Sequence, residues 1–236
     1  MENTTYTYSD GHDTFIGRLI YDPSLGAQQP GVLIAPAYAG LGEDEIAIGE
    51  KIAALGYTVL AVDYYGDGKR AQSDEQAMEW MGFVNTNRDV FARRMIAALD
   101  ALKSIDRVTG PVGAMGYCLG GKAVLDLART GADLTAIAAL HGVFDAPDTI
   151  NTYKAAALIL HGWDDPLATP DNFVALTQEL TENCPDWHAE CYGHASHSFT
   201  NPNAQLPEMG IVYNKLAADR SWAALTRFFD EKLIAA

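Results

Sequence analysis

The stretch Pro111-Val-Gly-Ala-Met-Gly-Tyr-Cys-Leu-Gly-Gly121 decides the fold. Its first five residues are mostly apolar, and they lead directly into the pattern G-x-C-x-G, which places Cys118 between Gly116 and Gly120. This pattern predicts a nucleophile elbow, a sharp turn from a strand into a helix, with a thiol where serine is usual. The two glycines fit because such a turn needs neighbours without a Cβ atom. The N-terminal end of the expected helix favours a thiolate and a developing oxyanion.

Two other interpretations of this stretch are weaker. Cys118 could be a buried structural cysteine in a glycine-rich turn, but the order of strand, turn and helix favours the elbow. A dinucleotide-binding loop is disfavoured because the glycines do not follow G-x-G-x-x-G and occur late in the chain.

Apolar runs alternate with helical patterns on both sides of the elbow. The runs predict buried strands at residues 31–35, 57–62, 111–115, 134–140, 155–160 and 187–192. The helical patterns cover residues 45–55, 88–105, 122–130, 173–180 and 221–234. Residues 5–8 and 14–21 alternate apolar and polar, as an antiparallel edge hairpin does. We therefore expect one α/β domain over residues 1–236, with a mostly parallel sheet, helices on both faces and an antiparallel N-terminal edge.

Composition narrows the class of partner. The 236 residues carry 31 Asp and Glu against 16 Lys and Arg, a formal charge of −15, which disfavours nucleic acid and anionic membrane surfaces. The N-terminal residues show no secretory signal, and no stretch approaches the roughly 20 apolar residues of a membrane helix. Three cysteines are too few for a disulfide framework or a zinc site. We expect a cytoplasmic protein without a metal.

A thiol nucleophile needs a base, and the base needs an orienting acid, in the chain order nucleophile, acid, histidine. After the strand at 155–160 the sequence reads Asp164-Asp165, and Asp165 is preferred because the proline after it holds it extended. After the strand at 187–192 come His194 and His197. His197 is preferred because a Ser-Phe pair follows it and offers an apolar anchor. Asp164 is interpreted as a solvated turn residue.

The remaining histidines and cysteines receive structural interpretations. His141 and His161 close strands and could line the pocket, but they are interpreted as satisfied core histidines. His188 lies in an alternating strand and is expected at the surface. Cys184 and Cys191 have no glycine elbow and are expected to be inert.

An oxyanion hole requires two backbone N–H groups. We expect one from Leu119, directly after the nucleophile, and one from Tyr38 in the loop after residue 35. Such a site performs acyl transfer through a thioester that water hydrolyses. Residues 200–215 lack clear periodicity and are either a flap over the site or a surface loop. The candidate substrate-binding residues are Ala37, Tyr117 and Trp163, and further aromatic or apolar walls are Tyr38, Tyr64, Tyr65, Trp80, Met81 and Phe83.

The motifs Gly116-Tyr-Cys-Leu-Gly-Gly121, Asp165-Pro166 and His197-Ser-Phe199 together resemble the dienelactone hydrolase family of α/β hydrolases. The resemblance extends from residue 31 to the last helix. It implies a catalytic triad of Cys118, His197 and Asp165, with the backbones of Tyr38 and Leu119 as oxyanion donors. It also implies hydrolysis of lactones and small esters without a metal or organic cofactor.

The sequence departs from the family's best-known members at two places. They carry a glutamate in the loop after the first long parallel strand, where this chain has Ala37, and an arginine shortly after the triad histidine, whereas residues 198–204 contain no basic residue. We therefore expect neutral esters and lactones as substrates, with neutral phosphotriesters as a side activity, and Cys118 held partly as thiolate by His197. The alternatives are a non-catalytic small-molecule binding protein on the same scaffold and, less favoured, a redox-sensing thiol protein. The sequence leaves the oligomeric state open.

Overall fold

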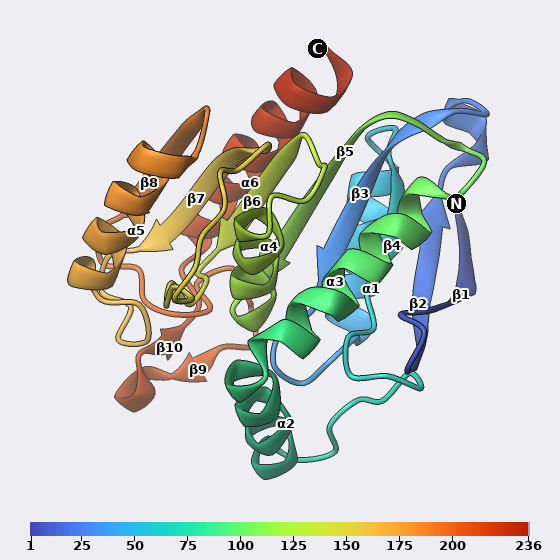
Figure 1. The fold of residues 1–236 in the computed structure, drawn as a ribbon. Helices are drawn as coiled ribbons and strands as arrows, with labels where there is room; N and C mark the ends of the chain where they lie inside the picture. The colour runs from blue at the N-terminus through green and yellow to red at the C-terminus, as the bar shows by residue number, and fades with distance from the viewer. Residues whose placement is uncertain (236) are drawn as a thin grey trace.

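The computed structural model describes residues 1–235, and within them eight strands form one twisted sheet in the order β1-β2-β4-β3-β5-β6-β7-β8 (Figure 1). The first two strands form an antiparallel hairpin, β2 runs antiparallel to β4, and every later pairing is parallel. The strand bounds are β1 Glu2–Ser9, β2 Thr14–Tyr21, β3 Gln29–Ala35, β4 Thr58–Ala61, β5 Val108–Tyr117, β6 Ala136–Leu140, β7 Ala156–Gly162 and β8 Trp187–Tyr192.

Helices cover both faces of the sheet, with α3, α4 and α5 in front and α1 and α6 behind in the view of Figure 1. Their bounds are α1 Glu43–Ala53, α2 Asp74–Thr86, α3 Arg88–Lys103, α4 Leu119–Arg129, α5 Pro170–Asn183 and α6 Lys215–Phe229, which a π-helical turn at Asp230–Ile234 extends. Two short strands, β9 Gln205–Leu206 and β10 Ile211–Val212, pair separately.

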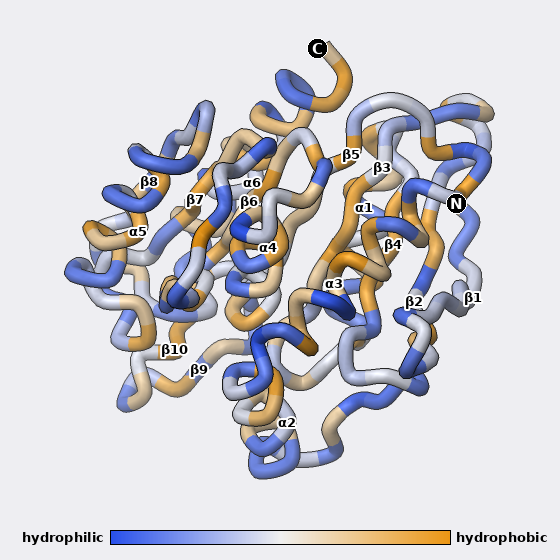
Figure 2. Tube along the Cα trace, in the orientation of Figure 1, coloured by the Kyte–Doolittle hydropathy of each residue, from blue (hydrophilic) through white to orange (hydrophobic). Residues whose placement is uncertain are grey.

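Strand periodicity divides the interior into two cores. Val32 and Ile34 of β3 pack with α1 and α6, whereas Leu33 between them packs with α3, α4 and α5. The central strands are therefore mostly apolar, and much of their length is orange in Figure 2. All eleven residues of α4 are buried, so the helix that follows the elbow is the most enclosed of α1 to α6.

The predicted architecture is confirmed, including the antiparallel N-terminal edge, and the differences are local. The sequence did not predict α2, because only Ala77 and Val84 of this helix are buried and the apolar stripe is too narrow to detect. The last helix begins at Lys215 instead of residue 221, because Asn214 caps it by accepting from the amide of Ala217.

Candidate active site

Cys118 stands in the single residue between a strand and a helix. β5 ends at Tyr117 and α4 begins at Leu119, so Cys118 is the N-cap of the buried helix. Its φ of 54° and ψ of −116° lie outside the regions that non-glycine residues ordinarily occupy. Backbone strain of this kind persists only where the surrounding structure enforces it.

The two elbow glycines are required by the close approach of backbone atoms. A Cβ atom on Gly116 would lie 2.1 Å from the carbonyl oxygen of Gly120. A Cβ atom on Gly120 would lie 2.1 Å from the carbonyl oxygen of Ala35, at the end of β3. The start of α4 therefore presses directly against the loop that follows β3.

The carboxyl ends of β7 and β8 bring the predicted acid and histidine together. A hydrogen bond of 2.8 Å joins Nδ1 of His197 to Oδ2 of Asp165, and both residues are almost fully buried. The second carboxylate oxygen, Oδ1, accepts from the backbone amides of Leu167 at 2.8 Å and Ala168 at 3.3 Å. Asp165 is thus held by its own loop in an orientation that serves the imidazole.

The environment of His197 favours its charged form. Burial alone would lower the pKa of the imidazole, but the hydrogen bond that the ring donates to Asp165 and the neighbouring thiol of Cys118 outweigh it and raise the pKa to about 10. Its Nε2 is buried and has no hydrogen-bond partner among residues 1–235. This nitrogen is therefore free to exchange a proton with the thiol.

His194 and Asp164, which the sequence disfavours as site residues, are exposed to solvent. The side chain of His194 is fully exposed, and its Nδ1 lies 3.7 Å from the half-exposed carboxylate of Asp164. This exposed pair contrasts with the buried pair of Asp165 and His197.

Two buried histidines lie beside the site. His141 has a φ of 36°, shares a hydrogen bond of 2.8 Å between Nε2 and Oγ1 of Thr200, and lies with its ring centroid 5.2 Å from that of His197. His161 is completely buried and stacks on Phe173 at 5.1 Å. Neither ring nitrogen of His161 has a partner among the described residues, so its interpretation as a satisfied histidine is wrong. A buried aromatic cluster, not a hydrogen bond, holds the ring.

Residues 205–212 form a small hairpin that braces His197. The amide of His197 donates to the carbonyl of Gly210 at 2.9 Å, and its carbonyl accepts from the amide of Val212 at 3.1 Å. Gly210 has a φ of 65°, and a Cβ atom there would lie 2.5 Å from Pro166. The segment left open by the sequence is therefore packed against both the histidine and the loop that carries the acid.

The predicted oxyanion donors belong to the two segments that meet at Gly120, the start of α4 and the loop after β3. The amides of Tyr38 and Leu119 donate to no other group within residues 1–235. The side chain of Tyr38 reaches outward, where its hydroxyl donates to Oδ1 of Asp74 at 2.8 Å. Burial and this carboxylate raise the pKa of Tyr38 to about 12.

The candidate substrate-binding residues lie in different environments. Ala37 is half-buried in the β3 loop. Tyr117 is buried, and its ring centroid lies 5.6 Å from that of His141. Trp163 is 42% exposed beside Asp164 and packs edge-on against Phe173. Of the three, Trp163 is thus the most accessible to a ligand.

The other two cysteines stand away from the elbow. Cys184 is half-buried and ends α5, and Cys191 is exposed on β8. Burial raises the pKa of both thiols. Among residues 1–235, no group of three or more His, Cys, Asp or Glu side chains is arranged to hold a metal ion. No helix in that range is both long and apolar enough to span a bilayer.

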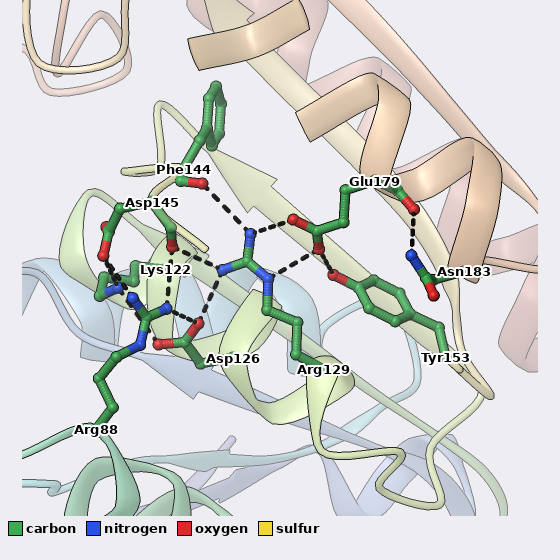
Figure 3. Close-up of polar contacts among 9 residues, drawn as sticks. All are labelled: Arg88, Lys122, Asp126, Arg129, Phe144, Asp145, Tyr153, Glu179 and Asn183. Carbon is green, nitrogen blue, oxygen red and sulfur yellow. Dashed lines mark hydrogen bonds and ion pairs between the residues drawn. The ribbon is translucent and has the colours of Figure 1, made fainter. Parts of the chain in front are cut away.

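Two features that sequence reasoning missed surround the elbow. The first is a buried ion network on α4, shown in Figure 3. Arg129 binds both oxygens of Glu179 at 2.9 Å and Oδ1 of Asp126 at 2.8 Å, and Lys122 binds Asp145 at 2.6 Å. The charged positions of α4 at 122, 126 and 129 recur on one helix face and pair with one another, but their further partners Glu179, Asp145 and Arg88 come from other segments, so the sequence alone does not reveal the network.

The second missed feature is Glu45. It lies in the first turn of α1, where an acidic side chain is ordinarily exposed to solvent and stabilises the N-terminal end of the helix. Here it is only 8% exposed and accepts hydrogen bonds from the amides of Ala37 and Gly42. Burial raises the pKa of its carboxyl group despite these amides.

A parallel sheet with helices on both faces and a cysteine elbow beyond the end of a central strand defines an α/β hydrolase. The sequence profile of the dienelactone hydrolase family matches residues 16–233, and the chain belongs to that family. The structure is similar to m3DLH, with a TM-score of 0.92 and 34% identity over 98% of both chains. It is equally similar to P91, a dienelactone hydrolase-like promiscuous phosphotriesterase from metagenomic libraries, with a TM-score of 0.91 and 33% identity over 98% of both chains.

A curated relative extends the comparison to an animal. The uncharacterized protein K02A2.1 of Caenorhabditis elegans is 33% identical over 144 residues, which span 58% of this chain and 91% of the relative. The family predicted from the elbow, the acid loop and the histidine loop is thus confirmed, and the chain is a hydrolase of the α/β class.

Proposed function

We propose that the protein is a thiol hydrolase of small, neutral esters and lactones, in which Cys118 is the nucleophile, His197 the base and Asp165 the orienting acid. The observation that carries this proposal is the buried hydrogen bond between Asp165 and His197, beside the only cysteine that stands in a strained elbow among residues 1–235. Nucleophile, base and orienting group in this order are the parts of covalent catalysis.

In the acylation step, the thiolate sulfur of Cys118 attacks the ester carbonyl, and the carbonyl π electrons move to oxygen. The amides of Tyr38 and Leu119 donate to this oxyanion. When the intermediate collapses, the C–O bond breaks and Nε2 of His197 gives its proton to the departing alkoxide. A thioester then remains on Cys118. In a lactone the departing alcohol stays attached to the acyl group.

In the second step, His197 takes a proton from water as the water oxygen attacks the thioester carbonyl. The C–S bond breaks, the carboxylic acid leaves, and the thiolate re-forms beside the imidazolium. The negative charge of Asp165 stabilises that imidazolium without exchanging a proton. In the neutral ring, the hydrogen bond between Asp165 and Nδ1 holds the tautomer in which Nε2 can accept a proton.

The charges around the site support a neutral substrate. Two cations of α3 and α4 are engaged in ion pairs: Arg88 binds Asp126 and Asp145, each at 2.6 Å, and Lys122 binds Asp145. The chain as a whole carries a charge of −15, which repels an anionic ester. A substrate carboxylate therefore lacks a counter-ion of the kind that an arginine after His197 would supply.

Neutral phosphotriesters are a second substrate class, supported by the similarity to P91 over nearly the whole chain. The thiolate sulfur of Cys118 would attack phosphorus, with the phosphoryl oxygen in the place of the oxyanion. The bond from phosphorus to one ester oxygen would break as His197 gives its proton to that departing oxygen. Water attack on the phosphothioester, with His197 as base, would regenerate the thiol.

The decisive experiment is a stopped-flow time course with p-nitrophenyl acetate for the wild type, Cys118→Ala and the exposed-cysteine control Cys191→Ala. We expect a burst of p-nitrophenol and steady turnover in wild type and control, and neither in Cys118→Ala. Equal turnover in all three proteins would refute the proposal. Stoichiometric labelling of Cys118 without turnover would instead identify a binding protein. A lactone that bears a carboxylate should react more slowly than its neutral analogue.

A further inference from the structure

The loop that follows β3 uses nearly every backbone polar group for its own support. The carbonyls of Pro36 and Ala37 accept from the hydroxyl of Tyr64 at 2.7 and 2.9 Å. The carbonyl of Tyr38 accepts from the hydroxyl of Tyr65 at 2.8 Å. The amide of Tyr38 is left without an acceptor among the described residues, as a donor reserved for a ligand would be.

Two adjacent peptide units set the direction of that amide. A peptide unit is planar, so the N–H of Tyr38 points opposite to the carbonyl of Ala37 in the same unit. That carbonyl is held by Tyr64 and by the amide of Gly40 at 3.0 Å. Turning the Tyr38 amide away from the site would break both hydrogen bonds.

The preceding peptide unit is held by Glu45. Its carbonyl, from Pro36, accepts from Tyr64, and its amide, from Ala37, donates to Oε1 of Glu45 at 3.3 Å. The other oxygen of the same carboxylate, Oε2, accepts from the amide of Gly42 at 2.9 Å, which is the N-cap of α1. One buried carboxylate thus joins the start of the loop to the start of the helix.

We infer that Glu45, together with Tyr64, is a positioning residue for the oxyanion hole. This inference rests on the proposed function, because the direction of the Tyr38 amide affects catalysis only if an oxyanion forms beside Cys118. Glu45 touches neither the substrate nor the thiol in this role. It acts through the backbone of residues 36–38, and a fixed amide is more valuable than a mobile one because it needs no reorganisation during the reaction.

The reaction of Cys118 with iodoacetamide provides the discriminating measurement. Alkylation displaces iodide from a tetrahedral carbon and places no negative charge on a carbonyl oxygen at the site. It therefore reports the reactivity of the thiol and of His197 but not the oxyanion hole. Acylation by p-nitrophenyl acetate needs all three.

The variants are Glu45→Gln, Tyr64→Phe and the control Glu43→Gln, an exposed glutamate in the same helical turn. Glutamine keeps the shape of Glu45 but turns a donating NH₂ group toward one of the two amides. We expect the acylation rate in Glu45→Gln and Tyr64→Phe to fall about 10- to 100-fold, less than the loss of a whole donor. The substrate Kd, taken from the concentration dependence of the burst rate, and the alkylation rate should stay within about twofold, because the interaction forms in the transition state. Glu43→Gln should match the wild type in both reactions.

An unchanged acylation rate in Glu45→Gln would overturn the inference. So would a parallel fall of acylation and alkylation, because that pattern indicates general damage to the site. If Glu45→Gln does not fold, Tyr64→Phe decides by the same two rates. Failure of the proposed function is seen separately, as ester turnover that survives in Cys118→Ala.

Discussion

Nδ1 of His197 and Oδ2 of Asp165 lie 2.8 Å apart in a part of the protein that water scarcely reaches. The carboxylate is in turn fixed by two backbone amides of its own loop. This chain of contacts connects the loop after β7 to the loop after β8 and defines which histidine can serve the thiol.

Asp165→Asn should lower kcat about 10²- to 10⁴-fold, because an amide no longer fixes the imidazole tautomer or stabilises its charge. The measurement is steady-state hydrolysis of p-nitrophenyl acetate, with circular dichroism to verify the fold. Asp164→Asn is the matched control, since that side chain is half-exposed and should leave kcat unchanged. Equal losses in the two variants would contradict the assignment of Asp165.

The thiols should differ sharply in reactivity. At neutral pH, iodoacetamide should modify Cys118 first, because the charged imidazolium of His197 stands beside it and favours the thiolate, whereas burial raises the pKa of Cys184 and Cys191. Intact-mass spectrometry followed by peptide mapping measures the order. A Cys184→Ser/Cys191→Ser protein should label at the wild-type initial rate, and labelling of Cys191 ahead of Cys118 would count against an activated elbow.

The pH dependence of stability should report the charged histidine. The folded state raises the pKa of His197 to about 10 from an ordinary value of 6.5, so its stabilising contribution is complete below pH ~6.5. That contribution is lost as the pH rises toward 10. Because the Cys118 thiol is one cause of the shift, Tm should fall less over this interval in Cys118→Ala than in the wild type. Parallel curves for the two proteins would argue against the coupling.

His161→Phe should stabilise the protein. Both ring nitrogens of His161 are fully buried and have no hydrogen-bond partner among the described residues. Replacing such unsatisfied polar groups should raise the free energy of unfolding by about 1–3 kcal/mol. Burial lowers the pKa of His161 to about 4, so the wild type loses stability as the pH falls below the ordinary value of 6.5. The gain in Tm should therefore be larger at pH 5 than at pH 8. His188→Phe, at an exposed position, should show no such gain.

Arg129→Met should destabilise the protein by about 3–5 kcal/mol, because it leaves the buried carboxylate of Glu179 without its cation and removes one of the cations paired with Asp126. Urea denaturation gives the free energy of unfolding. Adding Glu179→Leu should recover part of the loss. Lys215→Met, which breaks a solvent-exposed pair with Asp219, should leave the unfolding curve in place. A loss no larger in Arg129→Met than in Lys215→Met would show that the network of Figure 3 contributes little.

The sequence predicts those parts of the fold and the site that short-range residue patterns encode. The elbow and the strands beside it were predictable because glycine spacing and apolar runs are local signals. Asp165 and His197 were identified by their order and by the residues after them. Glu45 was not, because its first-turn position looks like an ordinary helix start and its partner Ala37 meets it only after folding. The same holds for Arg129, whose partner lies 50 residues away.

The hairpin at residues 205–212 has a kinetic consequence. Because both backbone groups of His197 are hydrogen-bonded to it, this segment cannot swing outward and leave the histidine in place. We therefore expect substrate to enter, and product to depart, without displacement of the hairpin. The turnover rate should depend on solvent viscosity only through the diffusion of substrate and product, and not through a motion of the hairpin. Shortening the hairpin to widen access would remove the support of the histidine along with the obstacle.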